Sequence, residues 1–540
     1  MRHRAVGGSR AEPPRESPAV RALSSRNLVY LLVAIGIALR LAQYLSNRSL
    51  WVDEAWLALN LVSRSFGELT KSLDFAQGAP PGFLFGEELV TRVFGFSEYA
   101  LRLLPLLCGA LSLGAFAWLS RRLLARKAAP LAILLFAVAD GFIYYASELK
   151  PYAVDVAASV ALIIAASKLV EHHVRDATAA LLGVGGLVLV AFSFPAVFFI
   201  AAVTATLALD ALIRRTRAPR LGVTVALSLW LCGSVAVGVF AASRLDEIRS
   251  GSTERFLGVS GSSSLAHAVN AFGTNIVAAM GFVGKAPFNQ LEKLALVLVL
   301  VGIVSFIGRN PVVLSVLLLP FVFTFVASAA NAYPLSERTE LFLVPPIILL
   351  LVEGVAKVAQ WTPSTWKAAT ALVLSSLVAA GPVYTAAKRM VHPREVEEIR
   401  PVLVFVRDHW RAGDTLYIHY GAQYAFLYYE ECGCLRLTVR GRALWPVREL
   451  AGRHQVDQAV LSRTRALVVG RYYGSHRREA VASLRKLMGR GRVWFLYSHV
   501  ANPAEASFIE HGLIGALDDM GVRLNGIDRH GAHAYLYDLK

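Results

Sequence analysis

The sequence predicts a polytopic α-helical membrane protein with a soluble α/β domain at its C-terminal end. Of the 540 residues, 55% are hydrophobic and only 17% are charged, whereas a soluble domain has about a quarter charged residues. Uninterrupted apolar stretches of about 17–25 residues, long enough to cross a hydrocarbon core of about 30 Å, recur along the chain. They stop near Lys388, and patterning typical of a soluble domain takes over.

The apolar stretches predict about eleven transmembrane helices. Pro195 divides one long apolar run into two of them. The first stretch has no small-residue cleavage site after it, so we interpret it as an uncleaved signal anchor. The expected spans are 28–45, 101–119, 129–145, 152–169, 178–193, 195–213, 221–242, 291–308, 311–329, 341–359 and 367–386.

Basic residues set the orientation, because loops rich in Lys and Arg remain in the cytoplasm. We therefore expect a cytoplasmic N-terminus in a bacterial cytoplasmic (inner) membrane, and an odd number of spans then places the C-terminal domain outside, in the periplasm. The net charge of +17 is explained by these loops and does not indicate nucleic-acid binding. The loops assigned to the inside contain Arg121, Arg122, Arg126, Lys127, Lys168, Arg175, Arg214, Arg215, Arg217, Arg220, Arg309, Lys357 and Lys367.

Three regions follow: a disordered Arg-rich cytoplasmic tail at 1–27, a transmembrane domain at 28–387, and an extracytoplasmic α/β domain at 388–540. Two outer loops are long. Loop 46–100 is amphipathic and should form short helices along the membrane interface, and loop 243–290 should act as a flap over a substrate.

In the C-terminal domain, alternating patterns predict helices at Glu395–Trp410 and Arg478–Met488. Strands are expected at Asp414–His419, Ala466–Val469 and Val493–Tyr497. No glycine-rich phosphate loop follows a strand, so nucleotide binding is not supported.

Ionisable residues near the outer membrane surface form the candidate site, because charges at membrane depth are costly and mark functional cavities. The adjacent acids Asp53 and Glu54 lie just after the first span. Each residue also has a simpler explanation: Lys150 or Arg338 as a cation snorkelling to the interface, Asp140 as a partner within the bundle, and Asp155 as a buried structural group. The candidates map to one face of the membrane: Asp53, Glu54, Asp140, Glu148, Lys150, Tyr152, Asp155 and Arg338.

This set suits sugar transfer from a lipid carrier. No nucleotide sugar is available on the outer face, so the donor would be a polyprenyl-phosphate sugar whose phosphate lies at the interface. Lys150 and Arg338 could hold that phosphate, and a carboxylate such as Asp53 could take the proton of the acceptor hydroxyl. A single base without a covalent intermediate implies inversion at the anomeric carbon.

Five motifs carry a resemblance to a known family. Together they resemble bacterial family 39-type glycosyltransferases of the GT-C class, akin to protein O-mannosyltransferases and lipid A aminoarabinose transferases. The resemblance covers roughly the first two-thirds of the chain and implies Asp53, with Glu54 beside it, as the catalytic centre, and Lys150 and Arg338 as donor-phosphate ligands. Glu148, Tyr152, Asp155 and Asp140 would bind substrate or support the site. The motifs are Ser49–Trp56 (SLWVDEAW), Gln77–Phe83 (QGAPPGF), Ser97–Pro105 (SEYALRLLP), Tyr144–Tyr152 (YYASELKPY) and Tyr333–Arg338 (YPLSER).

The expected partners are the lipid-linked donor, membrane lipids and an envelope acceptor that is a lipid, a glycan or a protein. Some relatives use a divalent metal ion, but the sequence shows no convincing ligand set, so metal dependence stays open. The alternative functions are a transporter or flippase, which would show paired repeats and mid-membrane charges, and a sensor or scaffold with an outer recognition domain.

Overall fold

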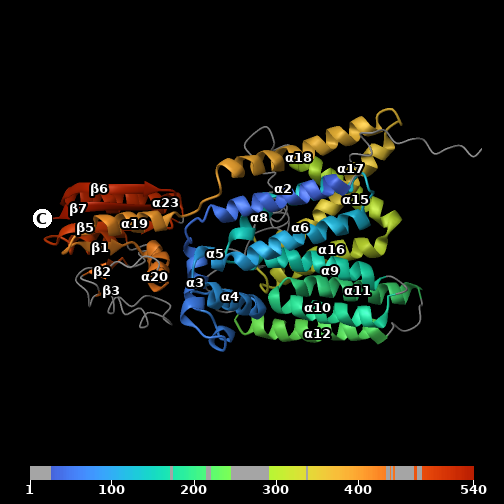
Figure 1. The fold of residues 1–540 in the computed structure, drawn as a ribbon, viewed down its shortest axis with the longest axis horizontal. Coiled ribbons are helices and arrows are strands. Elements are labelled where there is room, and N and C mark those ends of the chain that lie inside the picture. Colours follow the sequence, from blue (N-terminus) through green and yellow to red (C-terminus); the bar gives the residue numbers. More distant parts are fainter. Residues whose placement is uncertain are drawn as a thin grey trace, which may run out of the picture.

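The computed structural model describes residues 26–170, 174–214, 221–244, 291–335, 338–432, 438–439, 442–443, 467–470, 477–500 and 502–539. The expected tail, except for its last two residues, and all but two residues of the expected flap at 243–290 lie outside these residues. The described chain forms a long helical bundle with a smaller α/β domain at one end (Figure 1).

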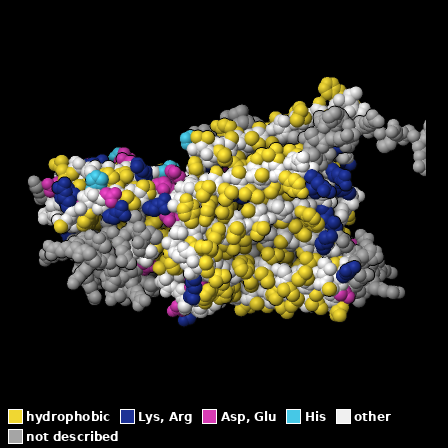
Figure 2. Space-filling view, in the orientation of Figure 1, with side chains coloured by type: hydrophobic (Ala, Val, Ile, Leu, Met, Phe, Trp, Pro, Cys, Tyr) yellow, Lys and Arg dark blue, Asp and Glu magenta, His cyan; other side chains and the backbone are white. Residues whose placement is uncertain are grey.

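The bundle contains a helix, or a bent pair of helices, at each of the eleven apolar stretches. Among the described residues, eight helices are long and apolar enough to cross a membrane, and a bent pair makes a ninth candidate. Two further apolar helices, α10 and α11, are shorter. Hydrophobic side chains cover most of the face of the bundle seen in Figure 2. The helices are α2 (Arg26–Leu45), α6 (Leu103–Leu123), α7 (Ala129–Val138), α8 (Asp140–Tyr144), α9 (Tyr152–Leu169), α10 (Asp176–Phe192), α11 (Ala196–Arg214), α12 (Leu221–Ala242), α15 (Leu291–Arg309), α16 (Pro311–Ala329), α17 (Val344–Trp361, preceded by the 3-10 turn η4, Leu341–Leu343) and α18 (Lys367–Val391).

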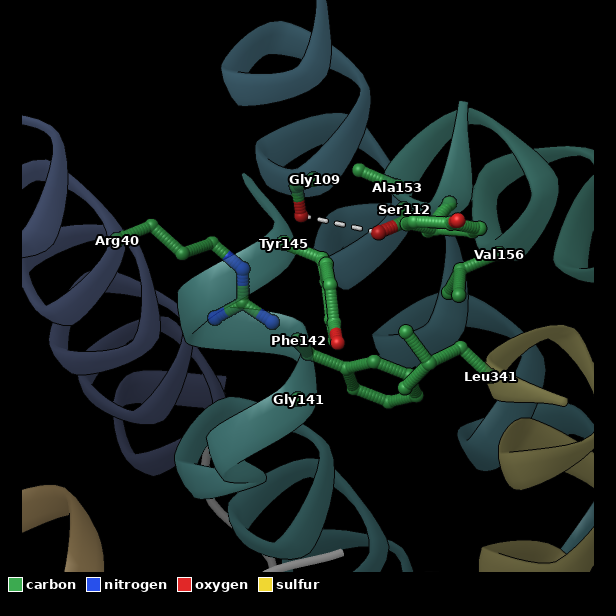
Figure 3. Close-up of a pocket in the computed structure, with 10 residues that line it drawn as sticks. Arg40, Gly109, Ser112, Gly141, Phe142, Tyr145, Ala153, Val156 and Leu341 are labelled. Atoms are coloured by element: carbon green, nitrogen blue, oxygen red, sulfur yellow. Dashed lines mark hydrogen bonds between the residues drawn. The ribbon is translucent and has the colours of Figure 1, made fainter. Parts of the chain in front are cut away.

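The bent pair is α7 and α8, which meet at Ala139 at an angle of 56°. A break in a helix leaves carbonyl groups without their intrahelical partners. Arg40 of α2 donates to the carbonyls of Phe136 and Ala137, at 3.2 Å each, as well as to Gly36 of its own helix. The fully buried Arg40 therefore stabilises the break, and it lines a small cavity together with Tyr145 and Tyr152 (Figure 3).

The first outer loop folds into short helices, as predicted: α3 (Val52–Ser63), the 3-10 turn η1 (Glu68–Thr70), α4 (Pro81–Phe94) and α5 (Glu98–Leu101). They lie at the end of the bundle that faces the C-terminal domain (Figure 1). Helix α4 exposes Leu89, Val93 and Phe94, which suits a helix lying in a membrane interface. A second 3-10 turn, η2 (Tyr145–Ser147), leads from α8 to the start of α9.

The C-terminal domain is built on a five-stranded sheet with the order β4-β1-β5-β7-β6. Strands β4, β1 and β5 are parallel, and β7 and β6 extend the sheet as an antiparallel hairpin. Two short strands, β2 and β3, pair separately. The strands are β1 (Thr415–Ile418), β2 (Thr438–Val439), β3 (Arg442–Ala443), β4 (Leu467–Val469), β5 (Gly491–Ser498), β6 (Val522–Arg529) and β7 (Ala532–Leu539).

Alternate strand residues face two different cores. Tyr417, Phe495 and Tyr537 pack in one cluster with the helices that follow β4 and β5. Leu416, Trp494 and their neighbours pack in the other, which also contains residues of α3 and α4. The sheet and the first outer loop therefore share a hydrophobic core. The helices are α19 (Ile399–His409), the 3-10 turn η5 (Tyr420–Ala422), α20 (Gln423–Glu431), α22 (Arg477–Arg485), α23 (Pro503–Ser507), the π-helix η7 (Phe508–Ile514) and α24 (Gly515–Met520).

The three expected strands and both expected helices of this domain are present, with two differences. The first helix begins at Ile399 rather than at residue 395, because Glu397 and Glu398 bind the backbone of the first outer loop. The β6–β7 hairpin was not expected. Strand β6 is almost entirely exposed and has Asn525-Gly526 at its centre, so it lacks the apolar alternation of a strand and resembles a turn.

Candidate functional site

The candidate site is built around Asp53, in the first turn of α3. The two acids of this turn, Asp53 and Glu54, follow the extended residue Trp51, and carboxylates are favourable near a helix N-terminus. Asp53 is 6% exposed and Glu54 is completely buried. The two side chains lie in different surroundings.

Asp53 lies between two cations from distant parts of the chain. Its Oδ1 accepts a hydrogen bond from Lys150 Nζ at 3.0 Å, and its Oδ2 pairs with the guanidinium of Arg338. Lys150 also donates to Gln77 Oε1 at 2.5 Å. Burial lowers the pKa of Lys150, an effect that the charge of Asp53 opposes. One carboxylate against two cations leaves one positive charge uncompensated within this group.

Aromatic rings border the Arg338 side of this cluster. The guanidinium carbon lies 5.6 Å from the ring centre of Trp51 and 5.8 Å from that of Tyr152, within the range of cation–π attraction. Tyr152 begins α9 and also lines the cavity beneath, next to Arg40. Tyr152 therefore lies near the Arg338 guanidinium and also lines this cavity.

Glu54 belongs to a buried network that holds the outer loop. Arg102 donates to both of its carboxylate oxygens, at 2.8 and 2.6 Å, and the Leu149 amide donates to Oε1 at 2.9 Å. Burial alone would raise the pKa of Glu54, but Arg102 and Arg48 hold it below its ordinary value. These contacts use both oxygens, so the surroundings of Glu54 suit a structural task rather than proton transfer.

Glu148 lies next to the same network. Its carboxylate is fully buried, 3.7 Å from Arg48, and burial together with the charge of Glu54 raises its pKa. Arg48 also donates to the Ser147 carbonyl and lies over the ring of Tyr144. Arg48 thus holds the turn that leads to Lys150 and partly balances the charge of Glu148.

Asp140 and Asp155 do not join the Asp53 cluster. Asp140 starts α8 and pairs with Arg389 of α18 at 2.9 Å, and with Arg394 at 3.8 Å. Asp155 is buried in the first turn of α9, and it forms no ion pair within the described part of the chain. Of the eight sequence candidates, the structure brings Asp53, Lys150, Arg338 and Tyr152 together, with Glu54 and Glu148 in the adjoining network.

Sequence reasoning assigned no role to several residues that build the site. Gln77 and Arg102 lie in motifs that were recognised, and their polar side chains between apolar neighbours were the available signal. Glu397, Glu398 and Tyr429 reach the Asp53 segment from about 345 to 379 positions away in the chain. No local pattern predicts such a contact.

No metal-binding cluster of three or more His, Cys, Asp or Glu side chains occurs among the residues that the structure describes. The oxygens of Asp53 and Glu54 already accept from cations. These residues do not form a ligand set for a divalent metal.

Comparisons with known proteins agree with this architecture. Residues 78–233 match the model of the dolichyl-phosphate-mannose-protein mannosyltransferase family. No curated protein sequence matches the chain.

Two groups of solved structures share the fold over nearly the whole chain. ArnT from Cupriavidus metallidurans bound to undecaprenyl phosphate superposes with a TM-score of 0.53 at 12% identity, over 95% of this chain and 98% of that one. The archaeal oligosaccharyltransferase AglB from Archaeoglobus fulgidus, in complex with an inhibitory peptide and a dolichol-phosphate, gives a TM-score of 0.50 at 12% identity, over 94% and 74%.

These matches confirm the resemblance drawn from the motifs. The chain is a multi-pass membrane protein that shares the fold of ArnT and AglB, and residues 78–233 match the mannosyltransferase family model. At this level of identity the structural likeness defines the fold.

Proposed function

We propose that this chain transfers a sugar from a polyprenyl-phosphate donor to a hydroxyl group of an acceptor on the outer face of a bacterial inner membrane. The observation that carries the proposal is the Asp53 carboxylate held between Lys150 and Arg338 at one end of the bundle. A base and two cations in contact are the groups that this transfer requires.

The cation pair suits the donor phosphate. A polyprenyl-phosphate sugar carries one negative charge on its phosphodiester, which matches the uncompensated positive charge of the cluster. When the phosphate binds, it competes with Asp53 for Lys150 and Arg338. Asp53 is then released from its two partners and becomes available to the acceptor.

Transfer proceeds by a single displacement. Asp53 takes the proton of the acceptor hydroxyl, whose oxygen forms a bond to the anomeric carbon. The bond from this carbon to the phosphate oxygen breaks, and its electron pair leaves with the polyprenyl phosphate. Lys150 and Arg338 stabilise the second negative charge that develops there, and attack opposite the leaving group inverts the anomeric centre.

The compared structures support the class of carrier. The ArnT structure contains undecaprenyl phosphate and the AglB structure contains a dolichol-phosphate.

The proposed orientation places the Asp53 end of the bundle and the C-terminal domain outside. Lys and Arg side chains gather at the opposite end of the bundle (Figure 2), where α6 ends with Arg121 and Arg122. The positive-inside rule assigns that end to the cytoplasm. A reporter enzyme fused after Lys540 should report the outer compartment, and a cytoplasmic signal would contradict this orientation.

The function is tested by incubating the purified full-length protein with a panel of polyprenyl-phosphate sugars and a cell-envelope extract. Mass spectrometry of the extract should detect one acceptor that gains the mass of one sugar, and NMR of the product should show an inverted anomeric centre. Absence of transfer from every donor in the panel would contradict the proposal.

A further inference from the structure

The segment from Asn47 to Val52, which leads into Asp53, is held from two sides. On the membrane side, Arg102 donates to the carbonyls of Arg48 and Ser49, at 2.7 and 3.1 Å. These bonds occupy backbone acceptors only. The backbone amides of the same segment point the other way, toward the C-terminal domain.

Three of these amides donate to side chains of the C-terminal domain. The Ser49 amide donates to Glu398 Oε1 at 3.1 Å, and the Leu50 amide donates to the Tyr429 hydroxyl at 3.0 Å. The Val52 amide donates to Glu397 Oε2 at 3.1 Å.

Glu397 is itself rigidly placed. It is 5% exposed, and its second oxygen, Oε1, lies 2.8 Å from Nδ1 of His499. The turn of the β6–β7 hairpin fixes the neighbouring backbone, because the Glu398 amide donates to the His530 carbonyl at 2.7 Å. A side chain at Gly531 would collide with the Val396 carbonyl, so the hairpin approaches this segment as closely as a glycine permits.

The hydrogen bond from the Val52 amide to Glu397 matters for the site because Val52 directly precedes Asp53. Val52 is the first residue of α3 and Asp53 is the second, so no flexible link separates the bond to Glu397 from the Asp53 backbone. A carboxylate that accepts from an amide at a helix N-terminus fixes the first turn. Misplacement of a reacting group by about 1 Å can cost about a hundredfold in rate.

We propose that the C-terminal domain completes the catalytic centre, with Glu397 as the positioning residue that fixes the first turn of α3 and thereby the Asp53 carboxylate. Glu398 and Tyr429 hold the preceding backbone. The proposal rests on the proposed function for the role of Asp53, but the placement of the segment can be measured separately.

The experiment uses the full-length protein in lipid nanodiscs and compares Glu397→Ala, Glu397→Asp and Glu397→Gln with wild type. Hydrogen exchange of the peptide covering residues 47–58 should become about tenfold faster in Glu397→Ala, while exchange in β5 and β7 stays unchanged. Turnover with a saturating donor should fall by about tenfold to a hundredfold, with the donor KM within about twofold of wild type.

Conservative variants separate positioning from general stability. Glu397→Gln keeps an acceptor oxygen for Val52 and a polar group toward His499, so it should recover turnover to within about threefold of wild type. Glu395→Ala is the matched control, because Glu395 is exposed on the same segment, and it should behave as wild type.

Several outcomes would overturn the proposal. Wild-type exchange and turnover in Glu397→Ala would do so, as would a loss that Glu397→Gln does not recover. If Glu397→Ala fails to fold, Glu397→Asp decides: its shorter side chain cannot reach both partners, and wild-type values would contradict the proposal. Absence of transfer by the wild type itself would contradict the proposed function, and hydrogen exchange would still decide the placement.

Discussion

Asp53 and Glu54 are neighbours in the first turn of α3, yet the structure gives them opposite surroundings. Glu54 is completely buried, and Arg102 and the Leu149 amide satisfy its oxygens. Asp53 pairs instead with two side-chain cations, Lys150 and Arg338, that come from distant parts of the chain. Under the proposed function, Glu54 builds the loop and Asp53 acts on the substrate.

The largest difference between the two acids should appear in activity. Asp53→Asn removes the proposed base without changing the size of the side chain, so transfer should fall by about a hundredfold to ten-thousandfold. Size-exclusion chromatography would measure the folded fraction, so that transfer is compared per amount of folded protein. Near-normal transfer by a folded Asp53→Asn would end the assignment of Asp53 as the base.

Glu54→Gln should instead reduce stability. Breaking a buried ion pair leaves Arg102 uncompensated, and such changes cost about 3–5 kcal/mol. The free energy of unfolding in detergent would measure this loss, with Glu395→Ala, at an exposed position, as the control. If Glu54→Gln is as stable as wild type but inactive, Glu54 takes part in the reaction and the comparison fails.

Substitution of Arg338 should weaken binding of the donor and leave binding of the acceptor nearly unchanged. Arg338→Gln should raise the donor concentration for half-maximal rate by about tenfold or more, because a charged hydrogen bond to the phosphate is lost. The half-saturating acceptor concentration should change little. Arg389→Gln is the control, since Arg389 pairs with Asp140 away from Asp53, and equal donor effects in both variants would argue against a phosphate role for Arg338.

The smallest expected effect concerns His499, which contacts Glu397 within the C-terminal domain and so supports the contact between the two domains. Burial lowers the pKa of His499, but the hydrogen bond to Glu397, together with the charges of Glu397, Glu505 and Asp53, outweighs burial and raises this pKa. A raised pKa means that this stabilisation is complete below about pH 6.5 and is lost as the pH rises through the folded-state value. Thermal unfolding between about pH 5.5 and 8.5 should show a smaller pH dependence in His499→Gln than in wild type, and identical profiles would contradict this link.

The sequence was sufficient for the bundle and for part of the site. Long apolar stretches predict helices without tertiary information, and motifs predicted that Asp53, Lys150 and Arg338 belong to one centre. The remainder depends on contacts between distant segments. Neither the pairing of Glu54 with Arg102 nor that of Asp140 with Arg389 leaves a local pattern.

The same limit applies to the C-terminal domain. The buried strand β5 has a clear apolar pattern, whereas the exposed edge strand β6 does not. The start of α19 was misplaced because Glu397 and Glu398 continue the helical pattern in the sequence. In the structure they precede the helix and bind the outer loop instead.

The most direct test of the account is the binding of undecaprenyl phosphate to Asp53→Asn, measured by native mass spectrometry beside the transfer assay. If Asp53 and the lipid phosphate compete for Lys150 and Arg338, removal of the Asp53 charge should leave binding at least as tight as in wild type while transfer is lost. Weaker binding of the lipid by Asp53→Asn would contradict the competition between carboxylate and phosphate on which the proposed mechanism depends.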